Sequence, residues 1–413
     1  MKHKKKIAIV SHALVNPVNQ NRWKILAQDD NYEVHLLVPK YWKTNWFAEE
    51  VIYEPKEVHE GNFNVWPIPT TNPRHWGTYF FKSMDANLRK IKPDFIFIVH
   101  EESVRIHHQI FLYKSIFASK AKIFFFSMNA RGIPYQSATN PLKKIIHKIL
   151  WLNIKKNTEV ALVHYPGCLK SLRSGGYQKP IYLQTQIGVD ENLFAPCSDT
   201  RSAYRKKLGF YNKFVIGYTG RLTNDKGVDD IAAVFLELAK ENQDIALLFI
   251  GNGELKNDLL DLFKQNNLED RTHITGFIDQ DLVPKYMNAM DTFILGSKTT
   301  KNWIDTFPLV TVQAQAVGLP VIASDSASIP WQLADTAKIY PEGDLKKLKN
   351  ALIQFISNPE LREDYSKKGK QRSHDYFCHK GMTKNFKKIL NQIENDQYIY
   401  HKDHEYYTQW KAY

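Results

Sequence analysis

The chain has 413 residues and a formal net charge of +13. One ordinary core cannot serve this length, so two domains are expected, and 43% hydrophobic residues supply enough apolar area for both. No apolar run approaches the roughly 20 residues of a membrane-spanning helix, and the three widely spaced cysteines argue against a disulfide framework or a zinc site.

The positive charge is compatible with nucleic acid, anionic lipid or an anionic substrate as a partner. No recognisable nucleic-acid-binding motif accompanies it, so nucleic acid is not expected. Residues 1–6 are basic like the start of a signal peptide, but the apolar run at 7–10 is too short for one and is expected to be a strand. These features predict a cytoplasmic protein.

In the first half, short apolar runs alternate with helical patterns, as in βαβ units that build a parallel sheet. Strands are predicted at residues 6–10, 34–38, 63–68, 95–99, 123–126 and 160–163, and helices at 78–91 and 104–117. The first strand–helix turn, at 11–21, lacks G-x-G-x-x-G, which disfavours a simple dinucleotide-binding dehydrogenase. Around residues 188–212 the pattern breaks into Asp, Asn, Pro and Ser, which indicates a connection between domains.

The second half restarts the alternation. Strands are predicted at residues 214–218, 245–250, 274–276, 292–295, 321–323 and 338–340, and helices at 228–240, 254–265, 282–287, 345–356 and 375–395. The fold class is therefore α/β, with domains at 1–195 and 213–374, a connection at 196–212 and a C-terminal helix and tail at 375–413. Open parallel sheets bind ligands at the carboxyl ends of their strands.

Two cations follow the first strand of the second half. Gly220-Arg221-Leu222 comes directly after that strand, and Lys226-Gly227 follows shortly. Arg binds phosphate oxygens through a planar fork and Lys acts as a point charge, so this segment suits a diphosphate-linked ligand. The alternative is a pair of ordinary surface cations on a loop.

An acidic segment later in the chain precedes a predicted helix. It reads Asp305-Thr306-Phe307-Pro308, and Gln313 follows within the helix. Pro308 suits the first helical position, where its missing N–H costs little. Asp305 could contact a ligand or cap the helix, and the pattern leaves both open.

These segments resemble the donor-binding domain of glycosyltransferase family 4, a retaining family with the GT-B fold. The resemblance is carried by residues 220–227, 250–254, 275–278 and 305–320, and it extends more weakly over 7–386. It implies two Rossmann-like domains facing a cleft, with a C-terminal helix that crosses back to the first domain. It also implies a nucleoside-diphosphate sugar as co-substrate, with no metal and no other cofactor.

The resemblance implies catalytic roles for Arg221, Lys226 and Asp305. In the family the two cations contact the diphosphate, where charge develops as it leaves. Asp305 stands at the acid that contacts the donor sugar, and Gln313 at the glutamate that binds ribose. Asp is one methylene shorter than Glu, and the neutral Gln can still hydrogen-bond two hydroxyls. The remaining donor-binding candidates are Gly220, Gly251, Phe277, Ile278, Phe307, Leu309 and Val310. For Gly251, ordinary turn chemistry is the alternative.

The first half is expected to hold the acceptor. His12 and Asn16 follow its first strand, and His100 and Glu102 follow a later one, so all four are acceptor-binding candidates. For His100, a structural role is the alternative. Asn129 stands near the place where many members of the family carry a His that touches the donor sugar, and it completes the catalytic candidates.

Residues 140–157 form a basic run with a helical pattern. The apolar residues are spaced to share one helical face, and basic residues surround that face. The apolar residues are Leu142, Ile145, Ile146 and Ile149, and the basic ones are Lys143, Lys144, His147 and Lys148. Two interpretations stay open: a helix that lies on an anionic membrane, or a helix that packs its apolar face on the core.

The sequence therefore predicts a metal-independent glycosyltransferase. It would move a sugar, with retention, from a nucleoside-diphosphate donor to a glycan or lipid-linked acceptor in surface polysaccharide or cell-envelope assembly. An anionic membrane surface is a further expected partner, with the protein cytoplasmic or peripheral on the inner face. The alternatives are a catalytically silent relative that binds sugar nucleotide or a partner enzyme, and a sugar-nucleotide epimerase.

Overall fold

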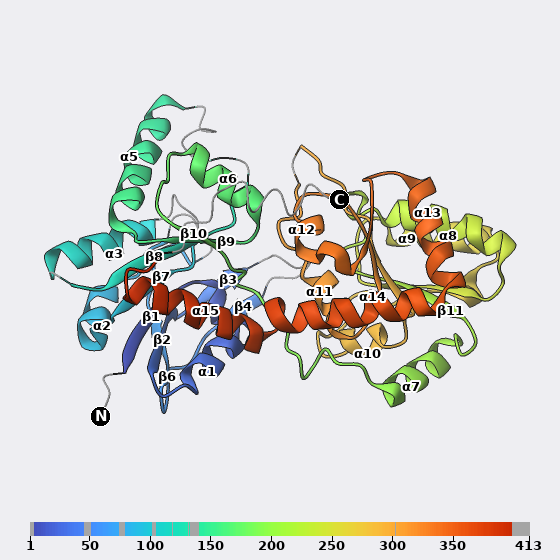
Figure 1. The fold of residues 1–413 in the computed structure, drawn as a ribbon, viewed down its shortest axis with the longest axis horizontal. Coiled ribbons are helices and arrows are strands. Elements are labelled where there is room, and N and C mark those ends of the chain that lie inside the picture. The colour runs from blue at the N-terminus through green and yellow to red at the C-terminus, as the bar shows by residue number, and fades with distance from the viewer. Residues whose placement is uncertain are drawn as a thin grey trace. The chain divides into compact units, whose positions relative to one another are not determined.

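The structure is a computed structural model that describes residues 4–44, 51–73, 79–100, 105–117, 119–130, 132, 140–301 and 303–398. The chain divides into two compact units (Figure 1). The first unit contains the described residues up to Gly188 together with those from His379 onward, and the second runs from Val189 to Cys378. Among the helices of the described residues, none combines the length and apolar character needed to cross a bilayer.

The first unit is built on an eight-stranded sheet in the order β10-β9-β8-β7-β1-β2-β6-β5. Every neighbouring pair is parallel except β5 with β6, which is antiparallel. The strands are β1 (Lys5–Val10), β2 (Tyr32–Pro39), β5 (Val58–Glu60), β6 (Phe63–Ile68), β7 (Phe95–Ile98), β8 (Lys122–Ser127), β9 (Ala161–Val163) and β10 (Ile181–Leu183). A separate antiparallel pair joins β3 (Trp42–Thr44) to β4 (Val51–Tyr53).

Helices cover this sheet, and the last one comes from the far end of the chain. They are α1 (Asn21–Ala27), α2 (Met84–Ile91), α3 (Arg105–Ile116), α5 (Pro141–Asn157), α6 (Pro166–Ser174) and α15 (His379–Glu394). The ring of Phe386 on α15 packs 5.2 Å from the ring of Trp23 on α1, and the Thr383 hydroxyl donates to the Arg22 carbonyl at 3.1 Å. The predicted return of the C-terminal helix to the first domain is therefore confirmed.

The second unit has a six-stranded parallel sheet in the order β13-β12-β11-β14-β15-β16. Its strands are β11 (Phe214–Thr219), β12 (Ile245–Ile250), β13 (Thr272–Ile274), β14 (Thr292–Leu295), β15 (Val321–Ser324) and β16 (Lys338–Tyr340). All six residues of β12 are buried, because helices cover both faces of a parallel sheet. Chain order runs outward from β11 on one side and from β14 on the other, so a topological switch point lies between these two strands.

α-Helices connect many of the strands of the second unit. They are α7 (Ser198–Leu208), α8 (Val228–Glu241), α9 (Lys256–Gln265), α10 (Val283–Met287), α11 (Leu309–Ala316), α12 (Ile329–Leu333), α13 (Leu345–Ser357) and α14 (Pro359–Arg372). Helix α7 occupies much of the segment expected as an irregular connection, and α14 was not predicted. Both carry charged residues around most of their surface, and only Gly369 of α14 is buried, so neither has a clear apolar period.

Several predicted boundaries were wrong. The C-terminal helix α15 begins at His379 instead of residue 375, because Cys378 before it is extended. Helix α2 begins at Met84 instead of residue 78, because Phe81 pairs with Thr70 in a β-bridge. The backbone N–H of Phe81 donates to the side-chain oxygen of Gln109 at 3.1 Å, and its carbonyl accepts from the Gln109 amide. Strand β13 ends at Ile274, two residues before the predicted end. The chain turns at Gly276, whose φ of +70° takes it out of the extended conformation.

Candidate functional site

The loops that leave β11 and β14 touch each other at the switch point of the second sheet. Gly227 follows a short 3-10 helix (Asn224–Lys226) and has a φ of +66°. A Cβ built on Gly227 would lie only 2.0 Å from the carbonyl oxygen of Gly296, in the loop after β14. Glycine is required here both for the left-handed backbone and for the close approach. This contact brings Lys226 next to the acidic segment.

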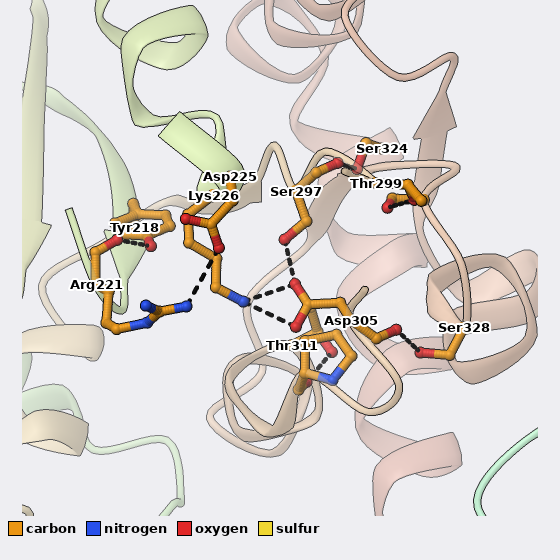
Figure 2. Close-up of polar contacts among 12 residues, drawn as sticks. Tyr218, Arg221, Asp225, Lys226, Ser297, Thr299, Asp305, Thr311, Ser324 and Ser328 are labelled. Atoms are coloured by element: carbon orange, nitrogen blue, oxygen red, sulfur yellow. Dashed lines mark hydrogen bonds and ion pairs between the residues drawn. The ribbon is translucent and has the colours of Figure 1, made fainter. Parts of the chain in front are cut away.

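Lys226 and Asp305 form a buried ion pair. The Lys226 ammonium donates to both carboxylate oxygens of Asp305, at 2.8 and 2.7 Å, and Figure 2 shows the lysine pointing at the acid. The two side chains are only 12% and 8% exposed. An ammonium has three N–H donors, so two are used here and a third remains for another acceptor.

Asp305 is held from several sides. The Ser297 hydroxyl donates to its carboxylate, and the Ser328 hydroxyl donates to its backbone carbonyl at 2.8 Å (Figure 2). Ser324 in turn donates to the Ser297 carbonyl at 2.6 Å. The N-cap of α11 is Pro308, one residue outside the position expected for it, and no side chain caps this helix. The capping alternative for Asp305 is therefore wrong.

Arg221 lies beside this pair and is half-exposed. Its guanidinium donates to Asp225 at 3.2 Å, and its backbone carbonyl accepts from the Tyr218 hydroxyl at 2.6 Å. Burial raises the pKa of that hydroxyl well above 10, so Tyr218 stays a neutral donor. Arg221 is thus anchored by its backbone while its charged end reaches solvent.

Trp303 joins the two cations and was not predicted as a site residue. Its ring centroid lies 4.6 Å from the Arg221 guanidinium and 4.8 Å from the Lys226 ammonium. Aromatic faces attract cations, so the ring stabilises both charges near the Lys226–Asp305 pair. An indole two positions before Asp305 was the available sequence signal. Ser297 was missed as well, because a serine after a strand carries no distinctive pattern.

In the first unit, His12 and His100 follow β1 and β7, which flank that sheet's switch point. Their rings stack at 5.0 Å, and the Tyr79 hydroxyl hydrogen-bonds Nε2 of His100 at 2.7 Å. The ring of Trp42 lies 4.9 Å from His12. Burial lowers the pKa of His12 to about 4, and burial together with the neighbouring His12 lowers the pKa of His100 well below 6.5. Both histidines are therefore neutral near pH 7. We call these four residues the histidine cluster.

The other acceptor candidates lie on neighbouring loops. The Asn16 side chain caps the 3-10 helix Pro17–Gln20 by accepting from Val18, and it donates to the Tyr53 hydroxyl at 3.4 Å. Asn129 follows β8, and its backbone N–H donates to the Ser127 hydroxyl at 3.3 Å. Glu102 lies outside the described residues. Acceptor binding stays a prediction for all of these residues.

Comparison with known proteins decides what the second unit is. Residues 200–372 match the family described as glycosyl transferases group 1. The second unit is a group 1 glycosyltransferase domain. The chain is 28% identical over 215 residues to a GDP-mannose-dependent monoacylated alpha-(1-6)-phosphatidylinositol monomannoside mannosyltransferase of Corynebacterium glutamicum, covering 50% of this chain and 56% of that protein. It is 25% identical over 238 residues to the capsular polysaccharide biosynthesis glycosyltransferase CapM of Staphylococcus aureus, covering 56% and 55%.

The chain thus spans about half the length of these curated relatives. A solved structure is similar over nearly the whole chain. A glycosyltransferase from Rickettsia africae has a TM-score of 0.68 at 15% identity and covers 95% of this chain and 99% of its own. The predicted GT-B fold, with its two parallel-sheet domains, is confirmed.

Within the glycosyltransferase domain, the glycines predicted to approach the donor also hold loops together. A Cβ on Gly251 would lie 1.9 Å from the Gly220 carbonyl oxygen, and both residues have a positive φ. The ordinary turn role therefore accounts for Gly251 by itself, and nucleotide contact stays a prediction. Phe277 follows the edge strand β13 and is 71% exposed, while Ile278 packs partly on the core.

Helix α11 of the glycosyltransferase domain carries the remaining donor candidates. Leu309 and Val310 form its first turn, and Gln313 lies further along it and is 7% exposed. Phe307 precedes the helix, and its ring packs 5.6 Å from that of Phe377. Among the described residues, no group of three or more His, Cys, Asp or Glu is arranged to hold a metal ion.

Proposed function

We propose that this chain is a retaining glycosyltransferase of family 4 that transfers a sugar from a nucleoside diphosphate to a glycan or lipid-linked acceptor. The observation that supports this most is the buried Lys226–Asp305 pair at the switch point, with the half-exposed Arg221 beside it. Such switch points are where open α/β sheets bind nucleotides. The group 1 match over the same residues supports the same reaction class.

In this proposal the two cations serve the leaving diphosphate. Charge grows on the diphosphate as its bond to the sugar breaks, and fixed cations there favour the transition state over the bound substrate. Arg221 offers a planar fork that reaches solvent, and Lys226 offers its remaining N–H. The carboxylate of Asp305 orients that ammonium and faces the donor sugar. Gln313 hydrogen-bonds the ribose hydroxyls through its amide.

The first unit binds the acceptor in this proposal. The histidine cluster is uncharged near pH 7, so it suits a neutral sugar better than an anion. Trp42, Tyr79 and His100 are buried and support His12, the partly exposed member, which would meet the sugar. Two of the relatives are a phosphatidylinositol monomannoside mannosyltransferase and a capsular polysaccharide biosynthesis glycosyltransferase, and they support a role in cell-envelope or surface polysaccharide assembly. We also propose that the protein works in the cytoplasm at the inner membrane face.

Calorimetry with a panel of nucleoside diphosphates tests the donor site. Arg221→Ala should weaken binding of the preferred nucleotide more than about tenfold, because a charge-assisted contact is worth about 1.5–3 kcal/mol. Lys213→Ala is the matched control, since Lys213 precedes the same strand at its opposite end and pairs with Asp244. Equal affinity in wild type and Arg221→Ala for every nucleotide would exclude the assignment.

A silent relative that binds sugar nucleotide without transferring the sugar is the second candidate. Asp305 and Gln313 both depart from the two glutamates of the family pattern, and this favours it. Transfer and hydrolysis assays over a panel of nucleoside-diphosphate sugars separate the two candidates. Binding without turnover of any donor would select the silent relative, and interconversion of free sugar nucleotides would select an epimerase.

A further inference from the structure

Helix α5 is attached to the first unit by one face only. Trp151 and Ile154 are buried, and the Trp151 indole donates to the Gly175 carbonyl at 2.6 Å. Five large apolar side chains of the same helix are instead exposed by 45–67%. They are Leu142, Ile145, Ile146, Ile149 and Leu152. The core-packing interpretation of these side chains is therefore wrong.

The exposed residues form one continuous stripe. At about 100° of rotation per residue, the five lie within an arc of roughly 120° on the side opposite Trp151 and Ile154. We call them the α5 apolar stripe. Residues 141–157 contain five lysines and no Asp or Glu. Lys144, Lys148 and Lys155 run along one edge of the stripe, and Lys143 lies beyond the other.

The stripe is already formed in the folded protein. Asn140 caps the helix by accepting from the Lys143 N–H at 3.1 Å, and Pro141 occupies the first turn. No folding step is therefore needed before the stripe can meet a partner.

Helix α3 extends the same apolar surface. It contacts α5, and the Asn153 amide lies 3.5 Å from Nδ1 of His108. Leu112 and Ile116 follow His108 at four-residue intervals, so they share its face, and they are 60% and 62% exposed. Figure 1 shows both helices at one end of the first unit. The two helices thus present seven large apolar side chains to solvent.

We infer that the α5 apolar stripe docks on an anionic lipid bilayer, with the helix lying in the plane of the membrane surface. An apolar stripe edged by lysines and free of acids is typical of interfacial helices, which place apolar side chains among acyl chains and lysines among phosphates. A second copy of this chain fits less well, because a symmetric contact through this face would oppose lysines to lysines. A protein partner would need acidic residues along both edges.

This inference deepens the proposed function and rests on it for its purpose, since a membrane-bound enzyme meets a lipid-linked acceptor directly. Attachment itself is measured without nucleotide, so it succeeds or fails separately from the donor site. The inference also changes which forces are expected to drive membrane binding. The exposed stripe supplies apolar insertion in addition to the charge of the lysines, so raising the salt concentration should weaken binding without abolishing it.

Flotation of the full chain with vesicles is the test, using phosphatidylcholine with and without phosphatidylglycerol. Wild type should float with the anionic vesicles far more than with the neutral ones. I145Q/I149Q/L152Q should lose at least about tenfold in affinity. K143E/K144E/K148E should lose roughly a hundredfold, because each lysine near an anionic surface is worth about fivefold. L260Q/I353Q removes two exposed apolar side chains from helices of the second unit and should bind like wild type.

The variants are expected to fold, since every substituted side chain is exposed, and circular dichroism with thermal unfolding checks this. Four results would overturn the inference. The first is no flotation of wild type with anionic vesicles at low salt, and the second is equal flotation of wild type with neutral and anionic vesicles. The third is equal flotation of I145Q/I149Q/L152Q and wild type. The fourth is a dimer in sedimentation velocity that I145Q/I149Q/L152Q dissociates, which would assign the stripe to a second copy.

Discussion

Replacing Lys226 by Met should destabilise the second unit strongly. The substitution keeps the length of the side chain and removes its charge. Both partners of the Lys226–Asp305 pair are at least 88% buried, since their exposed fractions are 12% and 8%. After the change the carboxylate keeps the Ser297 hydroxyl but has lost both bonds to the ammonium.

The size of the effect follows from that burial. Removing one partner of a buried ion pair typically costs about 3–5 kcal/mol, because the other charge stays desolvated. The double variant Lys226→Met with Asp305→Leu removes both charges, so it should recover at least half of the loss. Arg221→Ala should stay within about 1 kcal/mol of wild type, because Arg221 is half-exposed and its ion pair with Asp225 is screened by water.

Urea unfolding followed by circular dichroism measures these differences, with calorimetry of nucleoside diphosphate binding on the same samples. Lys298→Met is the control. Lys298 follows β14 and pairs with Asp229 and Asp230 in the first turn of α8, but it is more exposed, at 26%, so its loss should destabilise the protein less. Nucleotide affinity should fall more than about tenfold in both Lys226→Met and Arg221→Ala. A stability loss below about 1 kcal/mol in Lys226→Met would refute the reasoning, because it would mean that water screens the pair.

Four further outcomes are expected. Asp305→Asn should lower the transfer rate and leave nucleoside diphosphate affinity near wild type, and full activity would remove Asp305 from the catalytic set. Gly227→Ala should destabilise the protein by several kcal/mol in urea unfolding. The left-handed backbone accounts for about 1–3 kcal/mol of this loss, and the 2.0 Å approach to Gly296 adds to it. Gly343→Ala is the control: Gly343 has a φ of +77° and open space around it, so only the cost of the left-handed backbone should appear. Trp303→Ala should weaken nucleotide binding a fewfold, because cation–π contacts are worth about 0.5–2 kcal/mol, and Trp303→Phe should weaken it less. Unchanged affinity of Trp303→Ala in calorimetry would show that the ring does not contribute to nucleotide binding. The pKa of His12 is about 4 in the folded protein and 6.5 in the unfolded chain, so the unfolded chain takes up the proton first as the pH falls. The free energy of unfolding should therefore drop by on the order of 3 kcal/mol between pH 6.5 and pH 4. His12→Gln should flatten that part of the pH–stability curve, and an unchanged slope would count against the burial of His12.

Local patterns were enough to predict much of the fold. Strands β6, β12, β14 and β16 match the predicted strands residue for residue. In β12 and β14 every residue is buried, and a parallel strand buried on both faces gives a nearly continuous apolar run. Helix α14 escaped prediction although its start carries a signal, since Asn358 caps it and Pro359 opens it. It is held to the rest of the unit by Arg372, which donates to the Gln332 and Trp331 carbonyls, and such contacts leave no periodic trace.

The donor-site segments also followed from the sequence, but their partners did not. Arg221, Lys226 and Asp305 are recognisable because each stands beside glycine or proline turns after a predicted strand. That Lys226 bonds both oxygens of Asp305, with Ser297 as a further donor, depends on β11 and β14 being neighbours. Strand order is set by how helices pack on a sheet, and no short window of sequence contains it.

Helix α5 shows most clearly what the sequence determines and what only the tertiary structure decides. Its spacing of apolar residues and lysines already predicts an amphipathic helix, because periodicity is a property of neighbours along the chain. The sequence could not tell which apolar residues meet the core. The fold buries Trp151 and Ile154 and leaves the stripe from Leu142 to Leu152 in solvent, because α5 lies on the surface of the first unit and packs against it through one side.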